Sequence, residues 1–286
     1  MSNAWVEPAA NTQTPSVLVI IPTFNEVQNL AEIVSRTLAH TPYGHVLVVD
    51  DGSPDGTGIL ADQMALDDAR VHTIHRTGKL GLGSAYLAGF QWGIARQYAV
   101  LVQMDADGSH PPEALPRMIA TLDLSADDGV TPGLVIGSRW VRGGAVVNWP
   151  LTRQLLSRGG NAYARIALGI RVRDATAGYR AYRADVLRAV DFASVNSYGY
   201  CFQVDLTLRT LASNATIVEV PITFRERERG ESKMSRHIVL EAMVKVTTWG
   251  ATRRAIRVRD FFWNVGGVRR VERDVASKSA RAKTRP

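Results

Sequence analysis

The segment Val17-Leu-Val-Ile-Ile-Pro-Thr-Phe-Asn-Glu26 is an apolar run rich in β-branched residues, followed directly by a polar turn. Such a run is typical of a strand that is buried on both faces. Similar apolar runs recur at residues 46–49, 71–74, 99–104 and 134–137. Helical patterns separate them, at about residues 27–39, 57–69, 83–97 and 112–122. This alternation predicts an α/β fold with a mostly parallel central sheet flanked by helices.

The regular alternation stops after residue 138. Residues 216–224 alternate like one more strand, and Pro221 favours a place at the edge of the sheet. Amphipathic helical patterns occupy residues 162–170 and 238–249. We therefore expect three parts: a flexible leader over 1–15, a single catalytic domain over 16–250, and a basic tail over 251–286 that is either close to a membrane or disordered.

Composition narrows the class of protein. The 286 residues are 45% hydrophobic and 21% charged, which fits a globular protein with a sizeable core. The lone Cys201 excludes an internal disulfide and a cysteine-based zinc site.

The net charge of +7 is unevenly distributed along the chain. From Arg253 onward there are eleven Lys/Arg and three Asp/Glu, so this segment carries +8 and the remaining residues carry −1. A body that binds nucleic acid is therefore not expected.

Acidic residues follow three of the predicted strands. They lie in the segments Pro22–Glu26, Asp50–Thr57 and Asp105–Pro112. In a parallel sheet, ligands bind at the carboxyl ends of the strands. Asp105 and Asp107 are two residues apart, and such a pair can share one hard divalent cation that completes its shell with substrate phosphates.

Basic and glycine-rich segments supply counter-charges. The turn from Arg76 to Gly83 opens a helix, where backbone N–H groups can hold an anion. However, Tyr86 stands where a dinucleotide-binding fingerprint has its third glycine, so we do not predict a Rossmann site. Further cations are Arg139, Arg153, Arg158, Arg180, Arg227 and Lys233.

Together these segments resemble inverting glycosyltransferases of family 2, which have a GT-A fold, and more narrowly the polyprenol-phosphate (dolichol-phosphate) mannose synthases. The likeness covers about residues 16–250 and rests on these motifs: Pro22–Glu26, Asp50–Thr57, Lys79–Tyr86, Asp105–Pro112, Gly137–Arg139, Asp174–Arg180 and Gly230–Lys233. It implies transfer of mannose from GDP-mannose to a polyprenyl monophosphate, giving polyprenyl-phosphate-mannose and GDP.

The resemblance also implies roles for single residues. Pro22, Phe24 and Glu26 should hold the nucleotide, and Val49 and Asp51 should line the base pocket. Asp105 and Asp107 should hold Mg²⁺ or Mn²⁺, with Ala106 touching the sugar nucleotide and Ser109 at the place of a third metal ligand. Arg139, Arg227 and Lys233 should grip the donor diphosphate. Arg153 and Ser157 should lie near the acceptor phosphate, so that Asp107, Arg139 and Arg153 are the catalytic candidates.

This chemistry needs no strong general base, because the attacking phosphate oxygen is already ionised near neutral pH. Accordingly, we expect His110 to be a structural turn residue rather than a base. Asp174 is expected either to orient an arginine or the metal shell, or to form a plain structural ion pair.

A lipid acceptor requires contact with a bilayer. No apolar run approaches the roughly 18–20 residues of a membrane span. We therefore expect a cytoplasmic protein, peripheral at the cytoplasmic face of a membrane. Residues 162–170, 238–249 and 253–273 would provide the contact, or a membrane-embedded partner protein would. Alternatively, the two amphipathic helices pack on the core and the basic tail is solvated.

Three alternatives stay open. The first is the same fold using UDP-glucose and polyprenyl phosphate. The second is a family 2 transferase with a soluble or polysaccharide acceptor. The third is a binding module or inactive relative whose basic tail binds nucleic acid.

Overall fold

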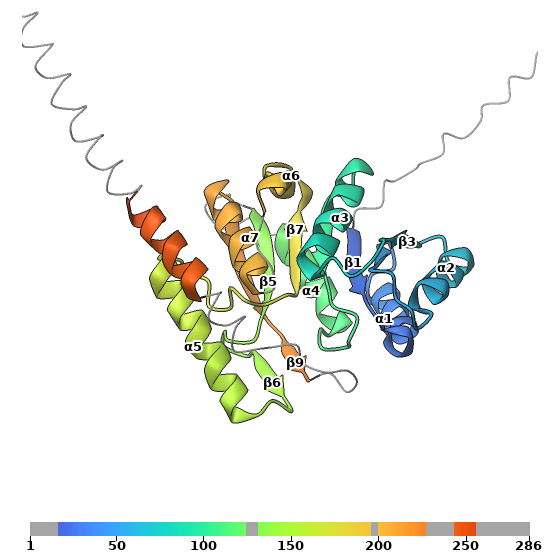
Figure 1. Cartoon of the computed structure of the whole chain (residues 1–286), viewed down its shortest axis with the longest axis horizontal. Coiled ribbons are helices and arrows are strands. Elements are labelled where there is room, and N and C mark those ends of the chain that lie inside the picture. The colour runs from blue at the N-terminus through green and yellow to red at the C-terminus, as the bar shows by residue number, and fades with distance from the viewer. Residues whose placement is uncertain (1–16, 124–130, 196–199, 227–242, 256–286) are drawn as a thin grey trace, which may run out of the picture. The chain divides into compact units, whose positions relative to one another are not determined.

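The computed structural model describes residues 17–123, 131–195, 200–226 and 243–255. Its first half repeats strand and helix as expected (Figure 1). The elements are β1 (Val17–Thr23), α1 (Val27–His40), β2 (His45–Asp50), α2 (Thr57–Asp67), β3 (Val71–His75), α3 (Leu82–Ala95), β4 (Val100–Gln103), η1 (Pro112–Ala114), α4 (Leu115–Asp123) and β5 (Pro132–Ser138). The predicted strands and helices here are confirmed, with ends that differ by a few residues.

The second half is less regular. It contains β6 (Ala145–Val147), α5 (Leu151–Leu168), β7 (Arg180–Arg183), α6 (Ala184–Arg188), η2 (Phe192–Ser194), α7 (Tyr200–Ala212), β8 (Thr216–Pro221) and β9 (Thr223–Arg225). A further helix spans residues 243–255. The predicted strand over 216–224 is in fact two strands, which are separated at Ile222 and join different sheets.

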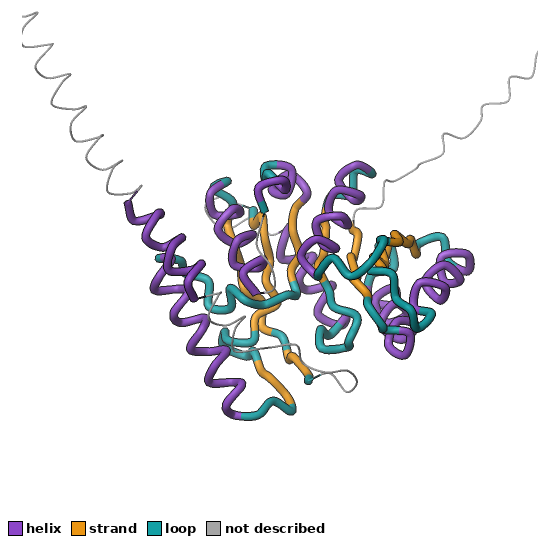
Figure 2. The backbone as a smooth tube through the Cα atoms, in the orientation of Figure 1, coloured by secondary structure: helices purple, strands orange, loops and turns teal. Residues whose placement is uncertain are grey.

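The main sheet has seven strands in the order β3-β2-β1-β4-β7-β5-β8 (Figure 2). The β1, β2, β3 and β4 pairings are parallel, as is β5 with β8, whereas β7 runs antiparallel to β4 and β5. The expected mostly parallel α/β sheet is thus confirmed, and β8, which ends at Pro221, lies at its edge. β6 and β9 form a separate parallel pair.

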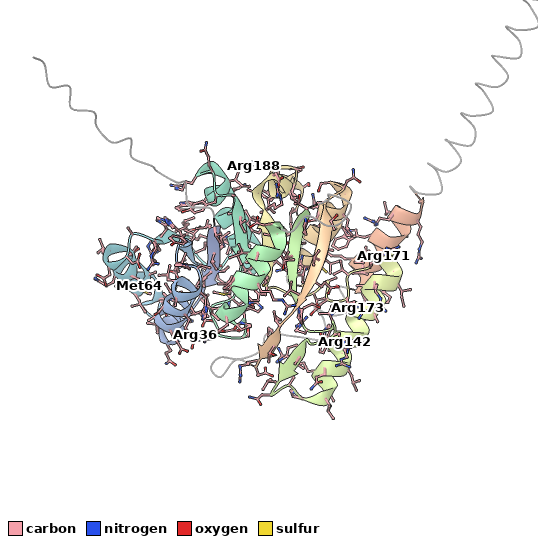
Figure 3. The ribbon with its side chains drawn as sticks, turned by 180° about the vertical axis from the view of Figure 1, so that it is seen from behind. Arg36, Met64, Arg142, Arg171, Arg173 and Arg188 are labelled. Carbon is pink, nitrogen blue, oxygen red and sulfur yellow. The ribbon has the colours of Figure 1, made fainter. Side chains whose placement is uncertain are left out.

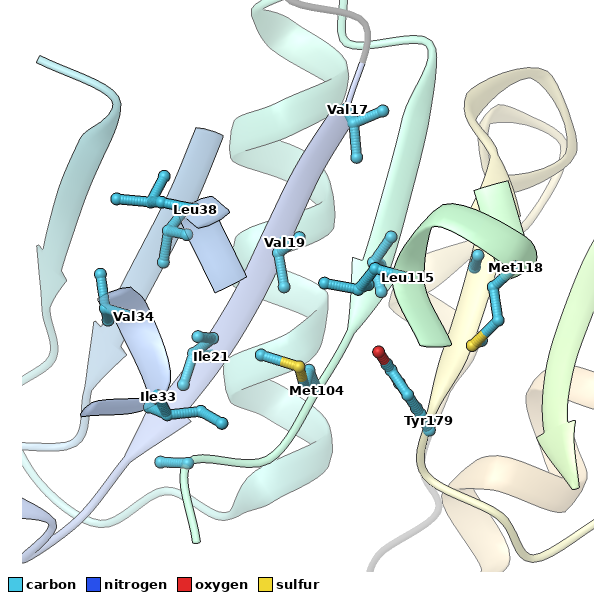
Figure 4. Close-up of a cluster of buried hydrophobic side chains, with 14 of the residues drawn as sticks. Val17, Val19, Ile21, Ile33, Val34, Leu38, Met104, Leu115, Met118 and Tyr179 are labelled. Atoms are coloured by element: carbon cyan, nitrogen blue, oxygen red, sulfur yellow. The ribbon is translucent and has the colours of Figure 1, made fainter. Parts of the chain in front are cut away.

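Helices cover both faces of this sheet. On one face, Val19 and Ile21 of β1 pack in a cluster with Ile33 of α1 and Leu115 of α4 (Figure 4). On the other face α3 lies so close that a Cβ at Gly89 would meet Ile20 of β1. Both faces are therefore buried, which explains why the strands read as unbroken apolar runs.

Two compact units can be distinguished, one within Met1–Ala162 and Val172–Lys233 and the other within Tyr163–Arg171 and Met234–Pro286. In the second unit the end of α5 packs against helix 243–255: the Tyr163 hydroxyl bonds the Thr247 hydroxyl, and Arg254 donates to the Ile166 carbonyl. In the part of the chain that the structure describes, every helix is too short or too polar to cross a bilayer.

Candidate active site

The carboxyl ends of β1, β2 and β4 meet at one edge of the sheet. Their parallel register pairs Thr23 with Asp50 and Ile20 with Gln103. The segments that follow these strands therefore lie at the same edge, as the sequence predicts, and they carry the three groups of acidic residues.

Asp50 serves the architecture of this edge. Its side chain is buried and accepts hydrogen bonds from the Thr23 hydroxyl (3.0 Å), the Ser53 backbone N–H (3.0 Å) and the Ser53 hydroxyl. Asp50 thus ties the end of β1 to the turn after β2.

Asp51 is held by the glycine-rich turn that precedes α3. Arg76 donates to its Oδ1 at 2.6 Å, and the backbone N–H groups of Leu80 and Gly81 lie 3.2 and 3.3 Å from its Oδ2. The expected anion cradle at the start of this helix therefore exists, but its occupant is a carboxylate of the chain itself.

Asp105 and Asp107 follow β4. Tyr86 donates its hydroxyl proton to Asp105 Oδ1 at 2.7 Å, and the Asp105 backbone N–H donates to His110 Nδ1 at 3.0 Å. Asp107 Oδ1 accepts from the backbone N–H and the hydroxyl of Ser109, at 3.1 and 2.6 Å. Burial, and then the Asp105 charge, raise the pKa of Tyr86 well above its usual value, so the phenol remains a proton donor.

His110 has the structural role that the sequence predicts. Its ring is buried and stacks on Tyr179 with centroids 4.9 Å apart. Because Nδ1 accepts the Asp105 N–H, the proton of the neutral ring is assigned to Nε2.

A chain of aromatic contacts connects the acidic turn to the arginines. His110 meets Phe224 edge-on at 5.6 Å, and Phe224 meets Trp149 at 5.3 Å. The guanidinium of Arg153 lies 4.0 Å above Trp149, and that of Arg139 lies 5.4 Å from it. The cations and the acidic pair, far apart in sequence, thus border one region of the fold.

Arg139 follows β5 and pairs with Asp174. Both residues are buried, with Nε–Oδ2 and Nη2–Oδ1 distances of 2.8 and 2.7 Å. Asn161 of α5 and Thr176 bond the same pair. Asp174 therefore pairs with an arginine, which fits both orientation of Arg139 and a structural ion pair. Other arginines, such as Arg142, Arg173 and Arg188, point to solvent (Figure 3).

Arg153 lies in the first turn of α5 and forms an ion pair with Glu226. Its side chain is 21% exposed. Ser157 is one helical turn further on the same side, and its carbonyl accepts from the Asn161 amide at 3.0 Å. The two residues expected near the acceptor phosphate therefore share one face of α5.

The remaining predicted residues lie around the same edge. Pro22 pairs in register with Val49, and the Val49 and Ala106 side chains are buried. Lys79 lies 4.3 Å above the ring of Phe24. Glu26 bonds the Asn29 amide at 2.8 Å. Arg227 and Lys233 lie outside the described residues.

The acidic pair suits a cation that borrows ligands from its substrate. Among the described residues, no group of three or more His, Cys, Asp or Glu side chains converges on a metal position. Two aspartates plus substrate phosphates are, however, a common ligand set for Mg²⁺. The Ser109 hydroxyl donates to Asp107 in this structure, so its place as a third ligand stays a prediction.

Three residues contact the candidate site residues although the sequence alone does not indicate this role: Tyr86, Asn161 and Glu226. Tyr86 lies in the Lys79–Tyr86 motif, but the motif does not show which carboxylate the Tyr86 hydroxyl contacts. Asn161 and Glu226 carry no motif, and only the fold brings them to Asp174 and Arg153.

The chain matches the family model described as "Glycosyl transferase family 2" over residues 18–191. It is 56% identical to the polyprenol monophosphomannose synthase of Mycolicibacterium smegmatis over 90% of this chain and 95% of that protein. It is also 56% identical to the undecaprenyl-phosphate mannosyltransferase of Micrococcus luteus, over 83% of this chain and 95% of that protein.

Solved structures support the fold. Glucosyl-3-phosphoglycerate synthase from Mycobacterium tuberculosis, in complex with Mn²⁺, UDP-glucose and phosphoglyceric acid, superimposes with a TM-score of 0.60 at 19% identity, over 83% of this chain and 80% of that one. At this identity the likeness concerns the fold alone, and it confirms the predicted GT-A architecture.

Proposed function

Because this chain belongs to glycosyltransferase family 2, we propose that it transfers mannose from GDP-mannose to a polyprenyl monophosphate and releases GDP. The observation that carries this proposal is the 56% identity, over nearly the whole length, to two enzymes whose names state mannose transfer to polyprenols. The acidic pair after β4, together with Arg139 and Arg153, would supply the charges that this reaction needs.

Asp105 and Asp107 would hold Mg²⁺ or Mn²⁺, which neutralises the diphosphate of the leaving GDP when bound. Hydrogen bonds from Tyr86 and Ser109 hold these two carboxylates before any ligand arrives. Such preorganised groups stabilise developing charge without reorganisation during the reaction.

Arg139 would contribute positive charge to the same leaving group. Its guanidinium is fixed by two bonds to Asp174, so little rotational freedom remains to be lost when the donor binds. Arg227 and Lys233, outside the described residues, would complete the grip on the diphosphate.

Arg153 and Ser157 would orient the acceptor phosphate for attack at the anomeric carbon. The attacking oxygen is already ionised, so the chain needs to align two anions rather than to remove a proton. In this structure Glu226 pairs with Arg153, and the acceptor phosphate would replace that carboxylate.

Helix α5 also supports a peripheral membrane contact. Leu151 and Leu155 lie one turn apart on α5, and their side chains are 76% and 69% exposed. On the other side of this helix, Arg153 and Ser157 are partly buried. A helix with leucines outward and its phosphate-binding side inward suits the surface of a bilayer that contains the acceptor. The basic tail over 251–286 would add attraction to anionic lipid. The protein would then act at the cytoplasmic face of the membrane, alone or with a membrane-embedded partner.

The test is a panel of radiolabelled sugar nucleotides incubated with polyprenyl phosphate and Mg²⁺ or Mn²⁺. We expect label from GDP-mannose in the lipid phase and none from UDP-glucose. Label from UDP-glucose would instead support the glucosyltransferase alternative. Transfer only to a water-soluble acceptor would contradict the proposed acceptor class.

A further inference from the structure

Tyr86 lies in the Lys79–Tyr86 motif, and the proposed reaction assigns it no contact with a substrate. It lies in the first turns of α3, and its side chain is completely buried. A buried phenol needs a hydrogen-bond partner for its hydroxyl, and Asp105 provides one.

The ring of Tyr86 is fixed by aromatic neighbours. It stacks on Phe202 of α7 with an interplanar angle of 8° and on Phe90 of α3 with an angle of 26°, with centroids 6.4 and 6.5 Å apart. Gly83, one turn earlier on α3, makes this possible, since a Cβ there would lie 2.9 Å from Phe202. The glycine thus admits the phenylalanine that holds the tyrosine.

The hydroxyl of this fixed ring contacts Asp105. It donates to Oδ1, while the backbone N–H of Asp105 donates to the buried His110. The Asp105 side chain nevertheless remains 31% exposed, so the carboxylate is anchored from inside and open on the other side.

We propose that Tyr86 is a positioning residue that orients the Asp105 carboxylate for its divalent cation. This inference rests on the proposed function, because it takes Asp105 and Asp107 as the metal ligands. Partners that hydrogen-bond a metal ligand typically change metal affinity about 10- to 100-fold when they are removed.

The experiment is the substitution Tyr86→Phe, which keeps the stacked ring and removes only the hydroxyl. Binding of Mn²⁺ in the presence of GDP, without turnover, is measured by electron paramagnetic resonance of the free ion. We expect the dissociation constant for Mn²⁺ to rise about 10-fold or more. Unchanged Mn²⁺ affinity in a folded variant would overturn the proposal.

A matched control is Tyr182→Phe. Tyr182 is equally buried and meets Phe90 edge-on, but its hydroxyl contacts Arg180 and Gln103 instead of an acidic residue. We expect its Mn²⁺ affinity to stay within about twofold of wild type, well below the change for a hydrogen-bonded ligand. An equal loss in both variants would mean a general packing effect and would also overturn the proposal.

A double-mutant cycle shows whether Tyr86 acts on the cation through Asp105. In an Asp105→Asn background, Tyr86→Phe should cause no further loss of Mn²⁺ affinity, because the two residues act as one unit. Additive losses would contradict positioning through Asp105. If Asp107→Ala leaves Mn²⁺ affinity unchanged, the metal site of the proposed function is misplaced, a result distinct from failure of Tyr86 alone.

Discussion

Arg139 and Asp174, 35 positions apart in the sequence, form a buried two-point ion pair with N–O distances of 2.8 and 2.7 Å. The Asp174 side chain is fully buried, and it also accepts a bond from the Arg139 backbone N–H at 2.9 Å. The pair joins the end of β5 to the segment before β7 and, through Asn161, to α5. It therefore connects the predicted donor side of the site with the helix that carries Arg153.

Asp174→Ala should be strongly destabilising. Removing one partner of a buried ion pair leaves an uncompensated charge and costs about 3–5 kcal/mol. Urea unfolding measures this loss. The control is Asp185→Ala, which removes a pair with Arg183 that is 38% and 58% exposed and should cost less than about 1 kcal/mol. Comparable losses in the two variants would contradict the assigned role of burial.

Asp107→Ala should abolish mannosyl transfer while the fold stays intact. The Asp107 side chain is partly exposed, and it accepts hydrogen bonds from the backbone N–H and the hydroxyl of Ser109, two residues away, so the fold should not depend on it. Turnover is measured with labelled GDP-mannose, and the fold by thermal unfolding. Wild-type turnover in the purified variant would show that the metal site has been assigned wrongly.

Arg153→Ala should impair use of the acceptor more than binding of GDP. Hydrogen bonds to charged groups contribute about 1.5–3 kcal/mol, so kcat/KM for polyprenyl phosphate should fall about 10- to 100-fold. Arg158→Ala is the control, because Arg158 is on the same helix but stacks 4.7 Å from Trp140. Loss of GDP affinity alone in Arg153→Ala would count against the acceptor role.

Leu155→Glu should weaken binding to vesicles made of neutral and anionic lipids. Burial of a leucine side chain is worth about 1.5–3 kcal/mol, so a tenfold or greater drop in the partition coefficient is expected. Leu66→Glu is the control: Leu66 is 82% exposed, but it lies on α2, away from the elements with the acceptor residues. Equal effects of both substitutions would argue against α5 as the membrane contact.

The protein should lose stability as the pH falls below about 6.5. Burial lowers the pKa of His45 and the pKa of His72 below the ordinary 6.5. The positive charge of Arg70 lowers the pKa of His45 further, and the charge of His45 lowers the pKa of His72 further. The two rings lie with Nδ1 and Nε2 2.8 Å apart, and the Tyr98 hydroxyl also contacts His45. Between the lowered folded pKa values and 6.5 the unfolded chain binds more protons, so the free energy of unfolding decreases as the pH falls through this range.

His72→Gln tests this pH dependence. Urea unfolding at several pH values between 5 and 8 should give a smaller decrease in unfolding free energy for the variant than for wild type. Above pH 7 the curves should be parallel, since both histidines are then neutral in both states. A variant slope equal to that of wild type would show that this pair does not contribute.

The fold class and the sheet edge at which the acidic residues gather could be predicted from the sequence. Five apolar runs as long as strands, three of them followed directly by Pro22, Asp50 or Asp105, leave few alternatives, and parallel strands bring their carboxyl ends to one edge. The sequence could not predict β7, because Arg180-Ala-Tyr-Arg183 is not an apolar run. Arg180 fits inside the sheet only because its guanidinium donates hydrogen bonds to the carbonyl groups of Ala175, Ala177 and Gln203. These contacts exist only in the folded chain.

The hydrogen-bond partners of the acidic residues at this edge could not be predicted, because they come from segments that are distant in the sequence. Asp50 is bound by Thr23 and Ser53, and Asp51 is bound by Arg76, whereas its predicted place in the base pocket stays a prediction. Asp105 has the same kind of position after a strand, yet it is anchored on one side and open on the other. The physical reason is that a carboxylate's role depends on which donors come within about 3 Å of it. The packing of helices and loops that are distant in the sequence brings those donors into place.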